Sequence, residues 1–229
     1  MTVSTAFADG SARPPTAAAR GQPITLALQG GGSLGAFAWG VLDRLLDTPE
    51  LRVAVVSGAS AGAMNAALLA QGLATGGPAE ARRLLEAFWR RVAAAAGSPD
   101  VPGAGWLLPF GGLMAPVADA LRQELRSLAL AQRLLADLPS SAPGVLARLR
   151  DARLHVIGAE EEFRALRPGS HQDPSWAFLQ RMRGLGHAAA DRWLAADLDA
   201  VGTRSTVDLS GFAGPALEPS LGTQRAEAA

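Results

Sequence analysis

The sequence predicts an α/β domain with a central, mostly parallel sheet flanked by helices, and three observations support this fold class. Residues 24–29 and 51–56 are short and almost continuously apolar, as expected for strands covered on both faces of a parallel sheet. Each run is followed by a glycine-rich turn, and each turn is followed by a helical pattern. The order strand, turn, helix, strand, turn, helix is that of a right-handed parallel crossover unit.

The rest of the chain adds further helices and one more strand. Apolar residues recur every three or four positions in several segments, which predicts helices over residues 78–96, 117–138, 143–150 and 174–200. Residues 153–159 are predicted to form a third strand. Residues 97–116 are rich in Gly and Pro and show no strand pattern, so we interpret them as a junction.

The chain length suits one sizeable domain. Its 229 residues are too few for two domains of ordinary size, and we place the single domain at residues 24–210. Residues 1–23 are rich in Ala, Pro, Ser and Thr, and we expect them to be a disordered N-terminal tail. Residues 211–229 are expected to be a disordered C-terminal tail.

Composition and charge exclude several classes of function. The 21 basic residues are balanced by 21 acidic ones, so nucleic acid is not an expected partner. The chain has no cysteine, which excludes disulfides, thiolate zinc sites and a cysteine nucleophile. The three histidines are scattered without ligand spacing, so a metal site is not expected. No signal peptide or transmembrane helix is predicted, and the expected location is the cytoplasm.

The second predicted strand leads into Gly58-Ala59-Ser60-Ala61-Gly62. A strand that turns sharply into a helix at a serine presents the hydroxyl at the top of a sheet, and Gly58 and Gly62 remove the Cβ atoms that would collide there. The amide of Ala61 begins the helix, where its dipole favours an oxyanion. The alternative is that Ser60 only caps this helix, a role that requires neither glycine.

The first predicted strand leads into Gly30-Gly31-Gly32. Adjacent parallel strands bring their following turns together, and consecutive glycine amides can form a nest for an anion above Ser60. The same segment matches the dinucleotide-binding fingerprint at Gly30, Gly32 and Gly35. That alternative calls for an acidic residue at the end of the second strand, and the strand lacks one.

A second rival is an α/β-hydrolase with a Ser-Asp-His triad. Its oxyanion loop and its elbow are usually separated by several strands and helices. Here Gly32 and Ser60 are 28 positions apart, which leaves room for a single helix and strand. This spacing argues against the triad enzyme.

Two segments, LQGGGSLGAFAWGVL and VVSGASAGAMNAALLA, resemble a patatin-like phospholipase domain. The resemblance is specific over residues 24–72, and residues 121–209 are similar to the C-terminal part of a bacterial subgroup. It implies a three-layer fold and a Ser-Asp dyad that cleaves acyl esters of lipids without metal or cofactor. It also implies that Ser60 is the nucleophile and that the amides of Gly31, Gly32 and Ala61 form the oxyanion hole.

The dyad aspartate of the family is not found. The family carries it in an Asp-Gly-Gly or Asp-Gly-Ala motif downstream of the serine, whereas the one Asp-Gly here is Asp9-Gly10, upstream. We hypothesise that an internal deletion at residues 97–116 removed the strands that bear it. Other carboxylates and a histidine available as a base lack the motif and read as surface, capping or structural residues: Asp100, Asp119, Asp173, Asp208 and His155.

The expected function is therefore a serine acyl-ester hydrolase acting on a lipid or another acyl ester. The missing base should lower its activity. The alternative is an inactive relative that binds lipid or a protein partner through the surviving pocket. Peripheral membrane contact is compatible with the arginines of residues 78–96, although a solvated helix face is the preferred explanation for them. Loss of strands should expose apolar surface, so self-association is expected.

Overall fold

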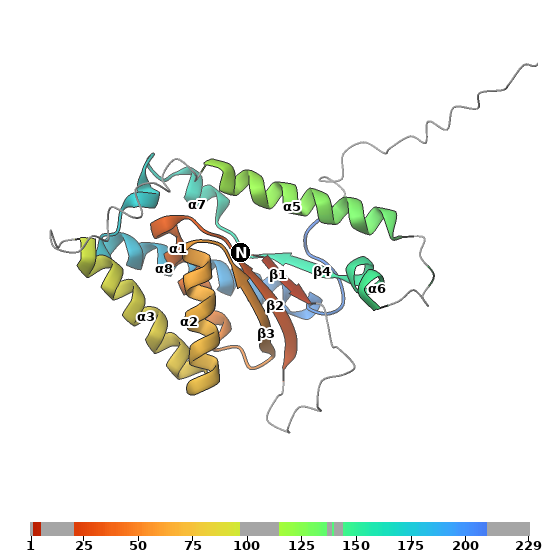
Figure 1. The fold of residues 1–229 in the computed structure, drawn as a ribbon, viewed down its shortest axis with the longest axis horizontal. Helices are drawn as coiled ribbons and strands as arrows, with labels where there is room; N and C mark the ends of the chain where they lie inside the picture. The colour runs from red at the N-terminus through yellow and green to blue at the C-terminus, as the bar shows by residue number, and fades with distance from the viewer. Residues whose placement is uncertain (1, 6–20, 97–114, 137–138, 140–143, 210–229) are drawn as a thin grey trace, which may run out of the picture.

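A computed structural model describes residues 2–5, 21–96, 115–136, 139 and 144–209 of the chain (Figure 1). Within these residues one sheet has the strand order β3-β2-β1-β4. The strands are β1 (Thr2–Thr5), β2 (Gln22–Leu28), β3 (Leu51–Gly58) and β4 (Arg153–Val156). The α/β fold class is confirmed.

Strands β2 and β3 form the predicted parallel pair, with a bulge after Ile24. Strand β1 lies between β2 and β4 and is antiparallel to both, so the sheet of the described residues is mixed and not mostly parallel as expected. The expectation of a disordered tail over residues 1–23 is therefore wrong for Thr2–Thr5, and β2 begins at Gln22, two residues earlier than expected. Without β1, one edge of β2 would leave its backbone N–H and C=O groups unpaired. The four residues of β1 are rich in β-branched side chains and supply the missing partners. Residues 6–20, 97–114 and 210–229 lie outside the described part of the chain.

The predicted helices are confirmed, with ends that differ by a few residues. The α-helices are α1 (Gly35–Leu45), α2 (Ala61–Thr75), α3 (Gly77–Ala96), α5 (Ala115–Leu134), α6 (Gly144–Asp151), α7 (Glu160–Arg164) and α8 (Trp176–Asp197). Short 3-10 turns are η1 (Gly32–Leu34), η3 (Ser170–Gln172) and η4 (Leu198–Ala200). The side chain of Gln132 on α5 donates to the carbonyl of Ala152, which precedes β4, at 3.0 Å.

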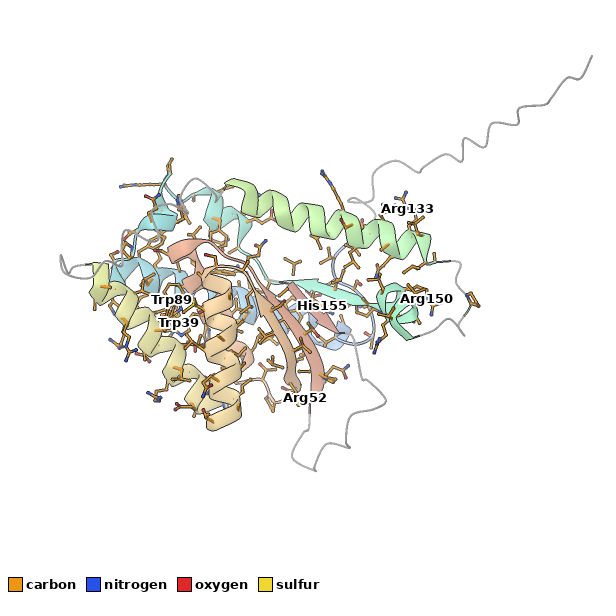
Figure 2. The ribbon with its side chains drawn as sticks, viewed as in Figure 1. Trp39, Arg52, Trp89, Arg133, Arg150 and His155 are labelled. Atoms are coloured by element: carbon orange, nitrogen blue, oxygen red, sulfur yellow. The ribbon has the colours of Figure 1, made fainter. Side chains whose placement is uncertain are left out.

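Buried residues of β2, α1, α2, α3 and α8 form a single hydrophobic core. Ile24, Leu26 and Leu28 alternate toward it along β2, as a half-buried strand requires. At its centre Trp39 and Trp89 stack with ring centroids 6.4 Å apart, and Figure 2 shows them side by side. This core places the carboxyl ends of β2 and β3 against the first turns of α1 and α2.

The opposite face of the β2–β3 pair is less covered. Val55, which pairs with Thr25, is 52% exposed, and Ala27 is also exposed. The apolar side chain of Val55 on an edge strand is the kind of surface that favours association between copies. Self-association stays a prediction.

Helices α1 and α8 cross with their backbones in contact. A Cβ atom at Gly40 would collide with the carbonyl of Arg183, and one at Gly186 would collide with the carbonyl of Phe37. Beside this crossing, the guanidinium of Arg183 lies 2.7 Å from a carboxylate oxygen of the buried Asp43. Burial raises the pKa of Asp43, and the paired Arg183 opposes that rise.

The side chain of His155 on β4 is packed inside the protein. Its side chain is fully buried, its Nδ1 lies 3.0 Å from the hydroxyl of Thr206, and its ring packs edge-on against Trp193. Figure 2 places it on the sheet. Strand β4 is three strand spacings from β3, about 14 Å at the usual separation. His155 is therefore too far from the end of β3 to act on Ser60.

Acidification should destabilise the protein through His155. Burial lowers the pKa of His155 below its ordinary value of 6.5, so on acidification the unfolded chain takes up a proton before the folded one does. Stability is then fully present above the unfolded pKa and falls as the pH drops below it, by at most about 1.4 kcal/mol per pH unit. Urea unfolding of the wild type and His155→Phe between pH 7.5 and 5 measures this slope. An equal slope in the two proteins would show that His155 does not cause it.

Candidate active site

Ser60 occupies a strained turn between β3 and α2. Its backbone angles are φ 52° and ψ −125°, and among the described residues other than glycine only Ser60 has a positive φ. Such a conformation costs of order 1–3 kcal/mol and persists only where its surroundings enforce it. A serine strained between a strand and a helix is the geometry of a nucleophile elbow.

The hydroxyl of Ser60 is not a helix cap. Ser60 stands at the N-cap position of α2, yet its side chain makes no capping hydrogen bond. Its carbonyl begins the helix by accepting from the amides of Ala63 at 2.8 Å and Met64 at 3.2 Å. The residue is exposed, so its hydroxyl is available to a ligand.

The two glycines of the elbow are required by close backbone packing. A Cβ atom at Gly58 would collide with the backbone of Gly62. One at Gly62 would collide with the carbonyl of Leu28 and lie 2.6 Å from that of Gln29. The elbow is thereby pressed onto the end of β2, where the amide of Ala59 also donates to Leu28 at 3.1 Å.

The triple-glycine segment lies directly against the elbow. A Cβ atom at Gly30 would be 2.9 Å from both the Cβ of Ser60 and the carbonyl oxygen of Ala59. Gly31 and Gly32 have positive φ angles, 148° and 56°, which glycine adopts at little cost. The two turns meet at the carboxyl ends of β2 and β3, as the sequence predicts.

Three amides are left free at this meeting point. Within the described residues, the N–H groups of Gly31, Gly32 and Ala61 donate to no backbone carbonyl or side chain. Ala61 is the first residue of α2, where the helix dipole is positive. Free amides on a glycine turn and at a helix start suit an anion.

A buried asparagine, which the sequence analysis did not single out, ties the elbow helix to its neighbours. The amide nitrogen of Asn65 donates to the carbonyl of Gly35 at 2.9 Å, and its oxygen accepts from the indole of Trp89 at 3.1 Å. Asn65 is fully buried, and a Cβ atom at Gly35 would lie 2.6 Å from that of Ala61. The sequence does carry a signal for Asn65, because it is a polar residue on the apolar side of α2.

Asn65→Leu should destabilise the protein by about 2–4 kcal/mol, because it leaves the carbonyl of Gly35 and the indole of Trp89 unpaired in the core. Gln71→Leu is the matched control, since Gln71 is exposed on the same helix, and should change stability by less than about 0.5 kcal/mol. Chemical unfolding followed by circular dichroism compares the two. Equal stabilities would contradict the bridging role of Asn65.

No carboxylate among the described residues is bonded to Ser60. Within the described residues, no Asp or Glu forms a hydrogen bond with its hydroxyl, and Asp173 instead accepts from the amide of Ser175 at 2.9 Å. Asp9 and Asp100 lie outside the described residues, as does the side chain of Asp119, while Asp208 is exposed. The described residues form four strands, so the deletion hypothesis stands as a hypothesis.

Comparison with known families decides which kind of protein this is. A family model for the patatin-like phospholipases matches residues 26–189, more than half of the chain. The chain belongs to the patatin-like phospholipase family. The match begins in β2, includes both glycine turns, and ends in α8. No curated protein and no solved structure gives a significant match.

Membership of the patatin-like family supports the lipid acyl hydrolases over the dinucleotide-binding alternative. The structure agrees with the sequence here, because β3 ends in Ser57 and Gly58 without the acidic residue that a ribose would need. In the described parts of the chain, no group of three His, Asp or Glu side chains is arranged to hold a metal ion. None of the described helices is long and apolar enough to span a bilayer.

Proposed function

We propose that this patatin-like protein is a serine acyl-ester hydrolase that acts on lipid esters, with Ser60 as its nucleophile. The observation that carries the proposal is the strained conformation of Ser60, held directly against Gly30. A hydroxyl needs neither strain nor flanking glycines to cap a helix, and this one does not cap. Both features are typical of a nucleophile elbow.

In the proposed reaction the hydroxyl oxygen of Ser60 attacks the ester carbonyl. The amides of Gly31, Gly32 and Ala61 stabilise the oxyanion that develops, assisted by the dipole of α2. The alcohol leaves, the acyl group stays on Ser60, and water then releases the fatty acid. Loss of one such donor typically lowers the rate by about 10²–10³-fold.

A second candidate is an inactive relative that binds lipid. A free serine hydroxyl is a weak nucleophile that needs an adjacent base, and no described side chain accepts a hydrogen bond from Ser60. An intact oxyanion hole without its base retains roughly 10³-fold catalysis over water. This candidate predicts binding to lipid vesicles without ester turnover.

Hydrolysis of p-nitrophenyl butyrate should depend on Ser60. We expect Ser60→Ala to lower the rate to the uncatalysed background, because the attacking oxygen is lost. Ser57→Ala is the matched control, since Ser57 lies on β3 with its hydroxyl 3.4 Å from the carbonyl of Leu26, and should keep the wild-type rate. Thermal melting verifies that both variants fold. Wild-type activity in Ser60→Ala would contradict the proposal, and an inactive wild type would favour the lipid-binding relative.

A further inference from the structure

We propose that the adjoining ends of α5 and α6 form a docking surface for an anionic lipid bilayer. This docking surface consists of the exposed side chains of residues 126–134 and 145–150. It belongs to other elements than the candidate active site, and it does not depend on the reactivity of Ser60. The inference therefore goes beyond the proposed function.

Exposed apolar side chains are concentrated on these two helices. Among the described residues, six large apolar side chains are exposed, and four of them lie here: Leu130, Leu134, Val145 and Leu146. Leu134 and Val145 are each 67% exposed, more than either of the other two, Val55 and Met64. One exposed apolar residue is ordinary on a protein surface, but a group of them marks an interaction site.

The two helices are tied to one another by Gln132 on the inner side of α5. Its amide nitrogen donates to the carbonyl of Leu149 at 3.2 Å and to that of Ala152 at 3.0 Å. Figure 1 shows α6 beside the end of α5 that lies furthest from α2 and α3. The apolar side chains of both helices are therefore gathered at one end of the molecule.

Helix α5 has a buried face and a free face. Leu125 and Ala129 are buried on its inner face. Leu130 and Leu134 are four positions apart, so they lie above one another on the outer face. No described element covers these two leucines, since both are exposed.

Arginines accompany the apolar side chains. The charged residues of positions 125–153 are five arginines and two aspartates, although the chain as a whole is neutral: Arg126, Arg133, Arg148, Arg150, Arg153, Asp137 and Asp151. Arg126 and Arg133 are exposed on the outer face of α5, and Figure 2 shows Arg133 and Arg150 at the same end of the molecule. Apolar side chains flanked by basic ones match a bilayer with anionic headgroups, because the apolar groups enter the acyl boundary while the cations meet the headgroups.

The same charges disfavour a second copy of the chain as the occupant. A two-fold axis places identical surfaces against each other, so the arginines of one copy would face the arginines of the other. Juxtaposed like charges oppose association. An anionic bilayer supplies the opposite charge and an apolar interior together.

Helix α3, whose arginines the sequence analysis considered for membrane contact, lacks this combination. Arg83 and Arg90 are bonded to Glu80 and Glu86, at 2.6 Å and 2.7 Å. None of the exposed large apolar side chains of the described residues lies on α3. These contacts support the interpretation of α3 as a solvated helix.

Co-sedimentation with lipid vesicles tests the docking surface. The wild type should bind vesicles of phosphatidylcholine with about 30% phosphatidylglycerol at least tenfold more tightly than vesicles of phosphatidylcholine alone. Leu134→Ser/Val145→Ser should weaken binding by at least about tenfold, because two inserted apolar side chains are lost. Arg126→Gln/Arg133→Gln should weaken binding to the anionic vesicles by about 20-fold, since each cation near the surface contributes about fivefold.

Matched controls carry the same changes elsewhere on the protein. Val55→Ser/Met64→Ser removes the other two exposed large apolar side chains of the described residues, and Arg91→Gln removes an exposed arginine of α3. Both should bind the anionic vesicles within about twofold of the wild type. All the substituted residues are exposed, so the melting temperatures should stay near that of the wild type.

Each contrary outcome overturns the inference in a distinct way. Absence of vesicle binding by the wild type, or equal binding by Leu134→Ser/Val145→Ser, removes the docking surface. Equal binding to neutral and anionic vesicles removes the role of the arginines, and a loss of binding in Arg91→Gln alone assigns the contact to α3. A wild-type dimer in sedimentation velocity that Leu134→Ser/Val145→Ser converts to a monomer shows that a second copy covers the surface. The vesicle assay needs no turnover, so an inactive wild type would refute the hydrolase without changing this result.

Discussion

Gly186→Ala is expected to lower the free energy of unfolding by about 2–3 kcal/mol, because the added methyl group collides with the backbone of α1 at Phe37. A backbone carbonyl cannot turn aside as a flexible side chain can, so the two helices must separate. The large core side chains near the crossing, Trp39 above all, would then lose contacts.

Gly184→Ala is the matched control for Gly186→Ala. It lies two residues away on α8, nothing stands within 4 Å of its added Cβ atom, and the helix gains about 1 kcal/mol from the better helix former. Urea unfolding should separate the two variants by at least about 3 kcal/mol, with opposite signs relative to wild type. Equal stabilities would show that α1 and α8 do not touch at this point.

Gly62→Ala is expected to disrupt the elbow itself. The new Cβ atom meets the carbonyls of Leu28 and Gln29, so the first turn of α2 must move away from β2. We expect a loss of about 2–3 kcal/mol in stability together with a loss of Ser60 reactivity in the molecules that remain folded. A displacement of about 1 Å at a catalytic group is enough to lower a rate 10²-fold.

Ala63→Gly is the control for Gly62→Ala. Ala63 is exposed in the same helical turn, and its replacement costs about 1 kcal/mol of helix stability without touching β2. Fluorophosphonate labelling, normalised to the folded fraction, should fall strongly in Gly62→Ala and stay near wild type in Ala63→Gly. Equal labelling of both would mean that the elbow does not hold Ser60 for reaction.

The features that the sequence predicts correctly are set by local chemistry. The β2–β3 pair, the helices and the elbow follow from apolar runs and glycines close together in the chain. Strand β1 was missed because its four residues lie in a segment of tail-like composition, and their pairing with β2 and β4 is long-range. The contact of the His171 carbonyl with Gly32 joins positions 139 apart in the sequence, and no local sequence pattern predicts it.

The proposed function requires that the fold around the β3–α2 turn activates the hydroxyl of Ser60. Mass spectrometry of the chain after reaction with a fluorophosphonate, followed by peptide mapping, measures this directly. We predict one adduct per folded chain, on Ser60, and none on the urea-unfolded protein. Equal labelling of folded and unfolded chains, an adduct on a different serine, or none at all would contradict the account.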